Sequence, residues 1–172
     1  MTSTEPSPSA ESVARGTEGP HDDRELDGAR LGLVSALVRG SGLVQHQLLL
    51  ASTEMGLTPQ QAQMLCIIDH SPRTMLQLSR LLRINKSSTT GLVDRAEHAG
   101  LLIRVQDKSD GRSWLVDLTR SGRILTKKFK RVVEDRLEGL LAPLPEQERN
   151  VLDAALSRLV IISEFPDTWP ED

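Results

Sequence analysis

The feature that most constrains the fold is a close succession of helix-start signals between residues 58 and 85. Thr58 and Thr74 are each followed by a glutamine three positions later, which is the pattern of a capping box. Asn85 is a favourable N-cap, and Gly100 is a favourable residue to end the helix that begins there. The predicted helices cover residues 59–70, 75–82 and 86–98.

After Gly100 the sequence changes from helical spacing to short β-prone runs. Residues 101–106 and 113–118 are predicted strands, and the polar residues 107–112 form the turn that joins them. Three short helices followed by a two-stranded hairpin is the order of a winged helix-turn-helix. The predicted fold is therefore mainly α-helical, with a small two-stranded β-wing.

Apolar residues also recur at helical spacing on both sides of this lobe, and a domain of this size cannot bury all of them. We therefore expect the flanking helices to pack against a second copy of the chain, as dimerisation helices. The expected organisation is a disordered tail (1–23), a first dimerisation helix (24–56), the winged helix-turn-helix lobe (57–118), C-terminal dimerisation helices (119–164) and a second tail (165–172).

The charge of the chain is unevenly distributed. Its net charge is −3, yet the segment from Arg73 to Arg131 contains 14 Lys and Arg against five Asp and Glu, a net charge of +9. A basic centre between acidic ends indicates a polyanionic partner such as double-stranded DNA. Charge alone leaves a solvated helix surface equally open.

The predicted helix 86–98 has the two faces that a recognition helix needs. Its apolar side chains would face the core: Leu92, Val93, Ala96 and Ala99. The opposite face is polar, includes Asp94, and begins with short hydroxyl residues that allow close approach to DNA phosphates and base edges. An ordinary capped helix with a polar surface is the alternative. The candidate DNA-binding residues of this helix are Lys86, Ser87, Ser88, Thr90, Gly91 and Arg95.

The turn of the hairpin provides a second candidate contact. Arg112 could enter a minor groove, whose negative potential attracts a guanidinium group, and Asp110 could orient Arg112 through a bidentate contact. Ser113 completes the candidate wing residues. Taken alone, the turn would be interpreted as a solvated loop. Its place just after the candidate recognition helix favours DNA contact instead.

The stretch from Leu57 to Gly122 resembles the MarR family of bacterial transcriptional regulators. The matching residues include Ser87-Ser88-Thr89-Thr90, Leu92-Val93-Asp94-Arg95, Gly100-Leu101-Leu102, Asp110 with Arg112, and Leu118-Thr119 with Gly122. The resemblance implies a homodimeric repressor that binds a pseudo-palindromic operator and is released by a small-molecule effector. Where many members have a first wing arginine this chain has Gly111, so wing contact would depend on Arg112.

The remaining signals are weak. The single cysteine, Cys66, is expected to be an inert packed thiol, and the two tryptophans, Trp114 and Trp169, are expected to be packing residues. The four histidines (His21, His46, His70 and His98) show no metal-ligand spacing, so neither a metal nor a cofactor is predicted.

Other functional classes were weighed against DNA binding. No nucleophile elbow, P-loop or dinucleotide fingerprint occurs, so an enzyme is not expected. A winged helix used as a protein-interaction or assembly module, without DNA reading, is the alternative function. Because the sequence lacks a secretion signal and an apolar run of roughly 18 residues, we expect a cytoplasmic, nucleoid-associated protein with no membrane partner.

Overall fold

The computed structural model describes residues 31–107, 111 and 113–163. The chain divides after Leu37 into two compact units. Of the first unit only residues 31–37 are described, and from Leu33 onward they belong to the first helix. Both predicted tails, 1–23 and 165–172, lie outside the described residues, as does the predicted start of the first helix at residue 24.

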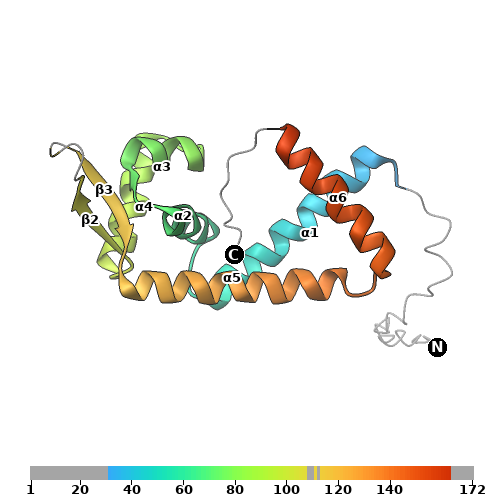
Figure 1. The fold of residues 1–172 in the computed structure, drawn as a ribbon. Coiled ribbons are helices and arrows are strands. Elements are labelled where there is room, and N and C mark those ends of the chain that lie inside the picture. Colours follow the sequence, from blue (N-terminus) through green and yellow to red (C-terminus); the bar gives the residue numbers. More distant parts are fainter. Residues whose placement is uncertain (1–30, 108–110, 112, 164–172) are drawn as a thin grey trace, which may run out of the picture. The chain divides into compact units, whose positions relative to one another are not determined.

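Six helices and three strands are formed by the described residues (Figure 1). In chain order they are α1 (Leu33–Glu54), α2 (Pro59–His70), β1 (Arg73–Thr74), α3 (Met75–Leu82), α4 (Lys86–His98), β2 (Leu102–Gln106), β3 (Trp114–Leu118), α5 (Arg120–Leu141) and α6 (Glu146–Ile162). The prediction of a mainly helical fold with a small antiparallel sheet is confirmed.

The helix starts follow from local capping. Both threonine capping boxes form: the backbone N–H of Gln61 donates to Thr58 Oγ1 at 3.2 Å, and that of Gln77 donates to Thr74 Oγ1 at 3.2 Å. In each box the glutamine side chain accepts a hydrogen bond from the threonine N–H in return. Four otherwise unpaired backbone donors are thereby satisfied, which fixes where α2 and α3 begin.

The sheet has one more strand than predicted. Its order is β1-β3-β2 and both pairings are antiparallel, with Arg73 opposite Val116 and Leu102 opposite Leu118. The two residues of β1 are too few to show the alternation of apolar and polar residues by which a strand is predicted. They become a strand only because β3 lies beside them. The hairpin is therefore anchored to the chain segment that leads into α3.

Helix α2 lies at the centre of the core. Met64, Leu65 and Ile68, which helical spacing predicts to be core residues, are at most 1% exposed. They pack with apolar residues of the neighbouring elements: Leu78, Leu82, Leu92, Val93, Val116, Phe129 and Val133. None of the helices that the structure describes is long and apolar enough to cross a bilayer.

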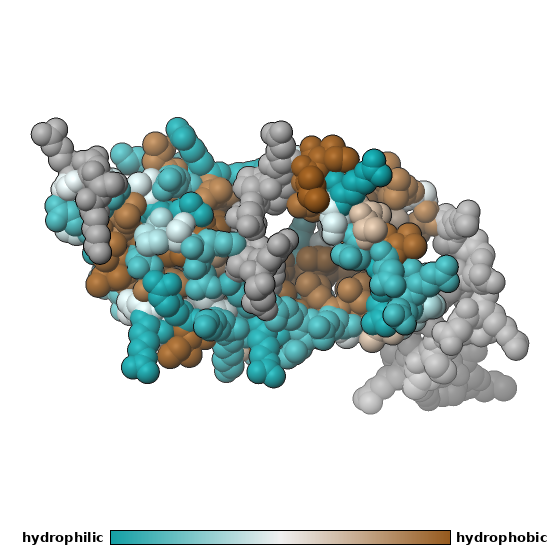
Figure 2. Space-filling view, viewed as in Figure 1, coloured by the Kyte–Doolittle hydropathy of each residue, from teal (hydrophilic) through white to brown (hydrophobic). Residues whose placement is uncertain are grey.

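Helix α6 differs from α2 because it buries none of its residues within the chain. Apolar side chains gather over it in the space-filling view (Figure 2), and the exposed set comprises Val151, Leu152, Leu156, Leu159, Val160, Ile161 and Ile162. Helix α1 likewise exposes Val38, Leu43, Val44, Leu49 and Leu50. Single exposed apolar residues are ordinary on a protein surface, but a series of them along one helix indicates an interaction surface.

Candidate nucleic-acid interface

Helix α4 presents a polar N-terminal turn. Asn85 caps it, because its Oδ1 accepts hydrogen bonds from the Ser88 backbone N–H at 2.8 Å and from the Ser87 hydroxyl at 2.7 Å. The Thr90 hydroxyl donates to the Lys86 carbonyl at 3.0 Å. The protons of Ser87 and Thr90 are therefore directed inward, and their oxygens remain able to accept from an outside donor.

The predicted faces of α4 are largely but not wholly observed. Leu92, Val93 and Ala96 are buried as expected, whereas Ala99 is exposed because the helix has already reached its C-cap there. Thr89 is fully buried and donates its hydroxyl proton to the Asn85 carbonyl at 3.0 Å, so the hydroxyl run is not uniformly surface-facing. Among the predicted contacts, Lys86, Ser87, Ser88, Thr90 and Arg95 are exposed and Gly91 is half-buried.

Gly91 makes room for the side chain of Arg95. A Cβ atom at position 91 would lie 3.3 Å from Arg95 Nη1, which is closer than most such contacts. The guanidinium group thus folds back over the glycine along the helix surface. Because Gly91 has no side chain, the basic group of Arg95 can lie over it, and the helix backbone at this position is open to close approach.

Asp94, on the polar face as expected, is held by the wing. Its side chain, 44% exposed, accepts a hydrogen bond from Arg104 Nη2 at 2.6 Å, while Glu97 accepts one from Arg104 Nη1 at 2.5 Å (the Arg104 bridge). The hydrogen bond to Asp94 raises the pKa of Arg104 above its ordinary value. Both acids of α4 therefore share one cation from strand β2, and the three groups together carry a net charge of −1.

Sequence reasoning missed this bridge. Asp94 and Glu97 are three residues apart and so lie along one edge of the helix, where one long cation can reach both. That signal was present in the sequence, but only the packing of β2 against α4 identifies Arg104 as the cation.

At the wing, the described residues establish the base of the hairpin. The Asp107 N–H donates to the Ser113 carbonyl at 2.9 Å, and Gln106 Nε2 donates to the Gly111 carbonyl at 2.5 Å. Ser113 is half-buried. Asp110 and Arg112, together with their predicted contact, lie outside the described residues.

Trp114 is not the packing residue that was expected. It is 58% exposed, whereas the next two residues on the same face of β3, Val116 and Leu118, are at most 4% exposed. Helix α4 and the hydrophobic core extend under the inner half of the hairpin only, so this first strand residue lies beyond them.

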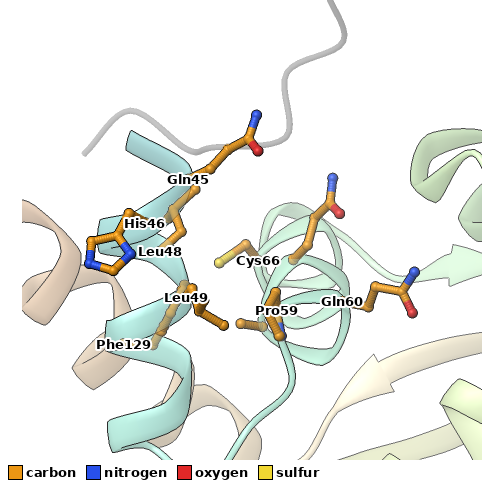
Figure 3. A pocket seen from close by; sticks show the side chains of 10 residues that line it. Gln45, His46, Leu48, Leu49, Pro59, Gln60, Cys66 and Phe129 are labelled. Carbon is orange, nitrogen blue, oxygen red and sulfur yellow. The ribbon is translucent and has the colours of Figure 1, made fainter. Parts of the chain in front are cut away.

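A cavity of about 670 Å³ opens between α1, α2 and α5 (Figure 3). Figure 3 shows the Cys66 thiol directed from α2 toward the side chains of α1. Five lining residues are apolar (Leu48, Leu49, Pro59, Ala62 and Phe129), and the others are Gln45, His46, Gln60, Gln63 and Cys66. None of these ten residues is a lysine, arginine, aspartate or glutamate.

The Cys66 thiol itself is buried, and burial raises its pKa to about 12. Because the thiolate is the reactive form, a thiol that stays protonated at neutral pH is a poor nucleophile. These findings agree with the expected packed thiol.

Helix α5 is tied to both neighbouring helices by ion pairs. Lys130 Nζ lies 2.5 Å from Asp69 Oδ2 of α2, with both side chains at most 14% exposed. Arg136 Nη2 lies 2.9 Å from Glu54 Oε2 at the end of α1.

Comparison with known proteins agrees with this geometry. A family model described as "MarR family" matches residues 55–113. A solved structure of the transcriptional repressor CouR, bound to a 23-mer DNA duplex, is 31% identical and has a TM-score of 0.61; the match covers 81% of this chain and 95% of CouR. The chain belongs to the MarR family.

Two further relatives of this MarR-family chain differ in coverage. The regulator PecS from Dickeya dadantii is 38% identical over 86 residues, which is 48% of this chain and 50% of PecS. The chain thus spans about half the length of the sequence relatives that it matches. The apo structure of MarR from E. coli covers 77% of this chain and 99% of its own, with a TM-score of 0.66 and 22% identity, and this likeness concerns the fold.

Proposed function

We propose that this MarR-family protein is a sequence-specific DNA-binding transcriptional regulator that acts as a homodimer. One observation carries the proposal: the exposed N-terminal turn of α4 offers Lys86, Ser87 and Thr90, while the two acids of that helix both bind Arg104, which offsets one of their charges. The positive end of the helix dipole favours a phosphate at that turn. The surrounding segment carries a net charge of +9.

The proposed contacts divide by chemistry. Lys86 and Arg95 meet phosphates, and the base edges are approached by the residues between them: Ser87, Ser88, Thr90 and Gly91. In the wing, Arg112 enters the minor groove, with Asp110 and Ser113 supporting it. Arg112→Ala is expected to weaken binding by roughly 1–3 kcal/mol. Unchanged affinity would remove the wing from the mechanism.

The homodimer is supported by the apolar surfaces of α1 and α6, which remain exposed in the single chain. A two-fold dimer would place two recognition helices about 34–36 Å apart, in successive major grooves of a pseudo-palindromic operator. Repression is the favoured sign of regulation, since the DNA-bound relative CouR is described as a repressor. Such a regulator acts at the chromosome, in the cytoplasm, and we assign it no catalytic activity.

We further propose the cavity between α1, α2 and α5 as the effector site. Its volume lies within the range of about 300–1,000 Å³ that is usual for small-molecule sites. Its lining offers amides, an imidazole and a thiol but no full charge, and a buried charge without a partner is strongly unfavourable. The favoured effector is therefore an uncharged, largely apolar molecule with hydrogen-bonding groups.

The decisive test of DNA binding is a gel shift with the DNA upstream of the protein's own gene. A salt-dependent complex that resists competitor DNA is expected. Failure to form it would favour the alternative, a winged helix that serves as a protein-interaction or assembly module.

The effector site is tested with a pair of probes that differ in charge but hardly in shape. 2-Naphthamide is expected to raise the melting temperature of the protein and to weaken the DNA complex, and 2-naphthoate to do neither. If 2-naphthoate raises the melting temperature and weakens the DNA complex while 2-naphthamide does neither, the uncharged-ligand assignment is overturned and the proposed DNA binding still stands.

A further inference from the structure

An exposed tryptophan next to the turn of the wing is not accounted for by the fold. Trp114 pairs with Gln106 at the last position of the β2–β3 ladder, immediately after the turn that the Asp107–Ser113 hydrogen bond closes. It is 58% exposed. Tryptophan contributes a large apolar surface with one N–H donor, so leaving it in water is unfavourable unless a partner covers it.

The register of the sheet determines which side Trp114 occupies. Side chains alternate along a strand, so Trp114 shares a face with Val116 and Leu118, both of which are buried. The residues opposite on β2 are Gln106 and Arg104. Since Arg104 on this face reaches the acids of α4, Trp114 lies on the same side of the sheet as the recognition helix.

We propose that Trp114 is a DNA-contacting residue, which packs its indole ring against a deoxyribose of the operator and donates its Nε1–H to a phosphate oxygen. The inference rests on the proposed DNA binding. DNA is the occupant that fits: the face is shared with the recognition helix, and the segment from Arg73 to Arg131 has a net charge of +9. The sugar edge and the phosphate of a nucleotide match the two halves of an indole.

The contact differs in kind from the proposed roles of Arg112 and the α4 residues. An apolar ring against a sugar adds affinity at a fixed position without reading a base, so it sets the register of the wing on the duplex. Trp114 is therefore a positioning residue, and its contribution should depend little on salt, because no phosphate charge is neutralised by it.

The test compares two exposed apolar residues on opposite faces of one sheet. Ile103 is 48% exposed and lies on the face away from α4, so Ile103→Ala is the matched control for Trp114→Ala. With the protein's own upstream DNA, Trp114→Ala is expected to lose at least about fivefold in affinity with an unchanged salt slope. Trp114→Phe keeps a ring but lacks the N–H, so its DNA affinity should lie between those of Trp114→Ala and the wild type. The DNA affinity of Ile103→Ala should match that of the wild type.

The outcomes separate the two proposals. If the wild type binds DNA and Trp114→Ala binds equally well, or if Ile103→Ala loses as much, the Trp114 contact is refuted while the regulator function stands. If the wild type forms no specific complex, the proposed function fails and the contact fails with it. Equal melting temperatures of the variants establish that each is folded.

Fluorescence gives an independent measurement. The chain has two tryptophans and no tyrosine, so Trp169→Phe leaves Trp114 as the only tryptophan. Addition of the same DNA to this variant is expected to quench or blue-shift the emission, because the ring leaves water. An unchanged spectrum at saturating DNA would overturn the contact.

Discussion

Arg104 of strand β2 donates a hydrogen bond to Asp94 of helix α4 at 2.6 Å. The same guanidinium reaches Glu97 one turn further along the helix. This one side chain therefore joins the wing to the recognition helix, and its single positive charge offsets one of the two negative charges there.

Loss of the Arg104 bridge is expected to affect DNA binding more than stability. These side chains are about one-third or more exposed, so Arg104→Met should lower the free energy of unfolding by about 1 kcal/mol or less. The loss of one positive charge near phosphates, at about 1 kcal/mol in water, should weaken DNA binding by about fivefold. Fluorescence anisotropy and urea unfolding measure the two quantities. Adding Asp94→Asn and Glu97→Gln to Arg104→Met should restore most of the affinity, and no recovery would contradict the charge argument.

Gly122 is the position in α5 where a side chain is least tolerated. A Cβ atom there would lie 2.1 Å from the carbonyl oxygen of Leu101, where the first turn of α5 meets the start of the hairpin. Gly122→Ala should destabilise the protein by about 2–3 kcal/mol through this overlap. Gly139→Ala, in the same helix with no atom within 4 Å, should instead be neutral or stabilising by up to about 1 kcal/mol. Urea unfolding of both variants tests the difference, and equal effects would rule out the close approach.

Cys66 should be unreactive in the folded protein. Its pKa is raised from 9.0 to about 12 by burial, so at pH 8 iodoacetamide should modify it only after the chain is unfolded in urea. Rapid modification of the native protein would show that the thiol is accessible. Cys66→Ser should also leave any response to oxidants intact.

The same shift predicts how stability depends on pH. A raised pKa means that the unfolded state loses the thiol proton first, so the contribution of Cys66 is complete below about pH 9 and is lost as the pH rises toward about 12. The maximum slope from one group is about 1.4 kcal/mol per pH unit. Between about pH 9 and pH 12 the free energy of unfolding, measured by urea titration, should fall less for Cys66→Ala than for the wild type. Parallel plots of this free energy against pH for the two proteins would contradict the raised pKa.

Helix α6 should govern the oligomeric state. Leu156 is 44% exposed in the single chain, so Leu156→Glu should fold but place a charge in the proposed dimer interface. Sedimentation velocity should then show monomers, and specific DNA binding should be lost with the second half-site contact. Ser157→Glu adds the same charge on the polar side of the helix, where Ser157 lies one turn from Asp153 and about 100° away from Leu156, and should leave the dimer intact. If both variants are monomeric, or if neither is, this face of α6 is not the dimer interface.

Local chemistry explains why the helices could be predicted. Each capping interaction joins residues three positions apart: the capping boxes of Thr58 and Thr74 and the cap of Asn85. Their hydrogen bonds can therefore be predicted from the sequence. The same holds for the start of α5, where the N–H of Gly122 donates to Thr119 Oγ1 at 3.0 Å.

Contacts between residues that are distant in the sequence could not be predicted from local patterns. Strand β1 exists because β3 lies beside it, and the carboxylate of Asp94 is paired because Arg104, ten residues later, meets it. Trp114 fits the pattern of a packing residue, yet the core ends before it. The apolar stripe of α6 was visible in the sequence, but only the structure shows that no part of it is buried within the chain.

The polar N-terminal turn of α4 combines both kinds of information. The sequence by itself determined that a capped helix with exposed hydroxyls begins at Lys86, since capping energies act over a single turn. Only the tertiary structure decided how its charges are arranged: Arg95 lies over Gly91, and Arg104 bridges the two acids. The reason is physical, because electrostatic interactions depend on distances in space, and β2 reaches α4 only when the core beneath them has packed.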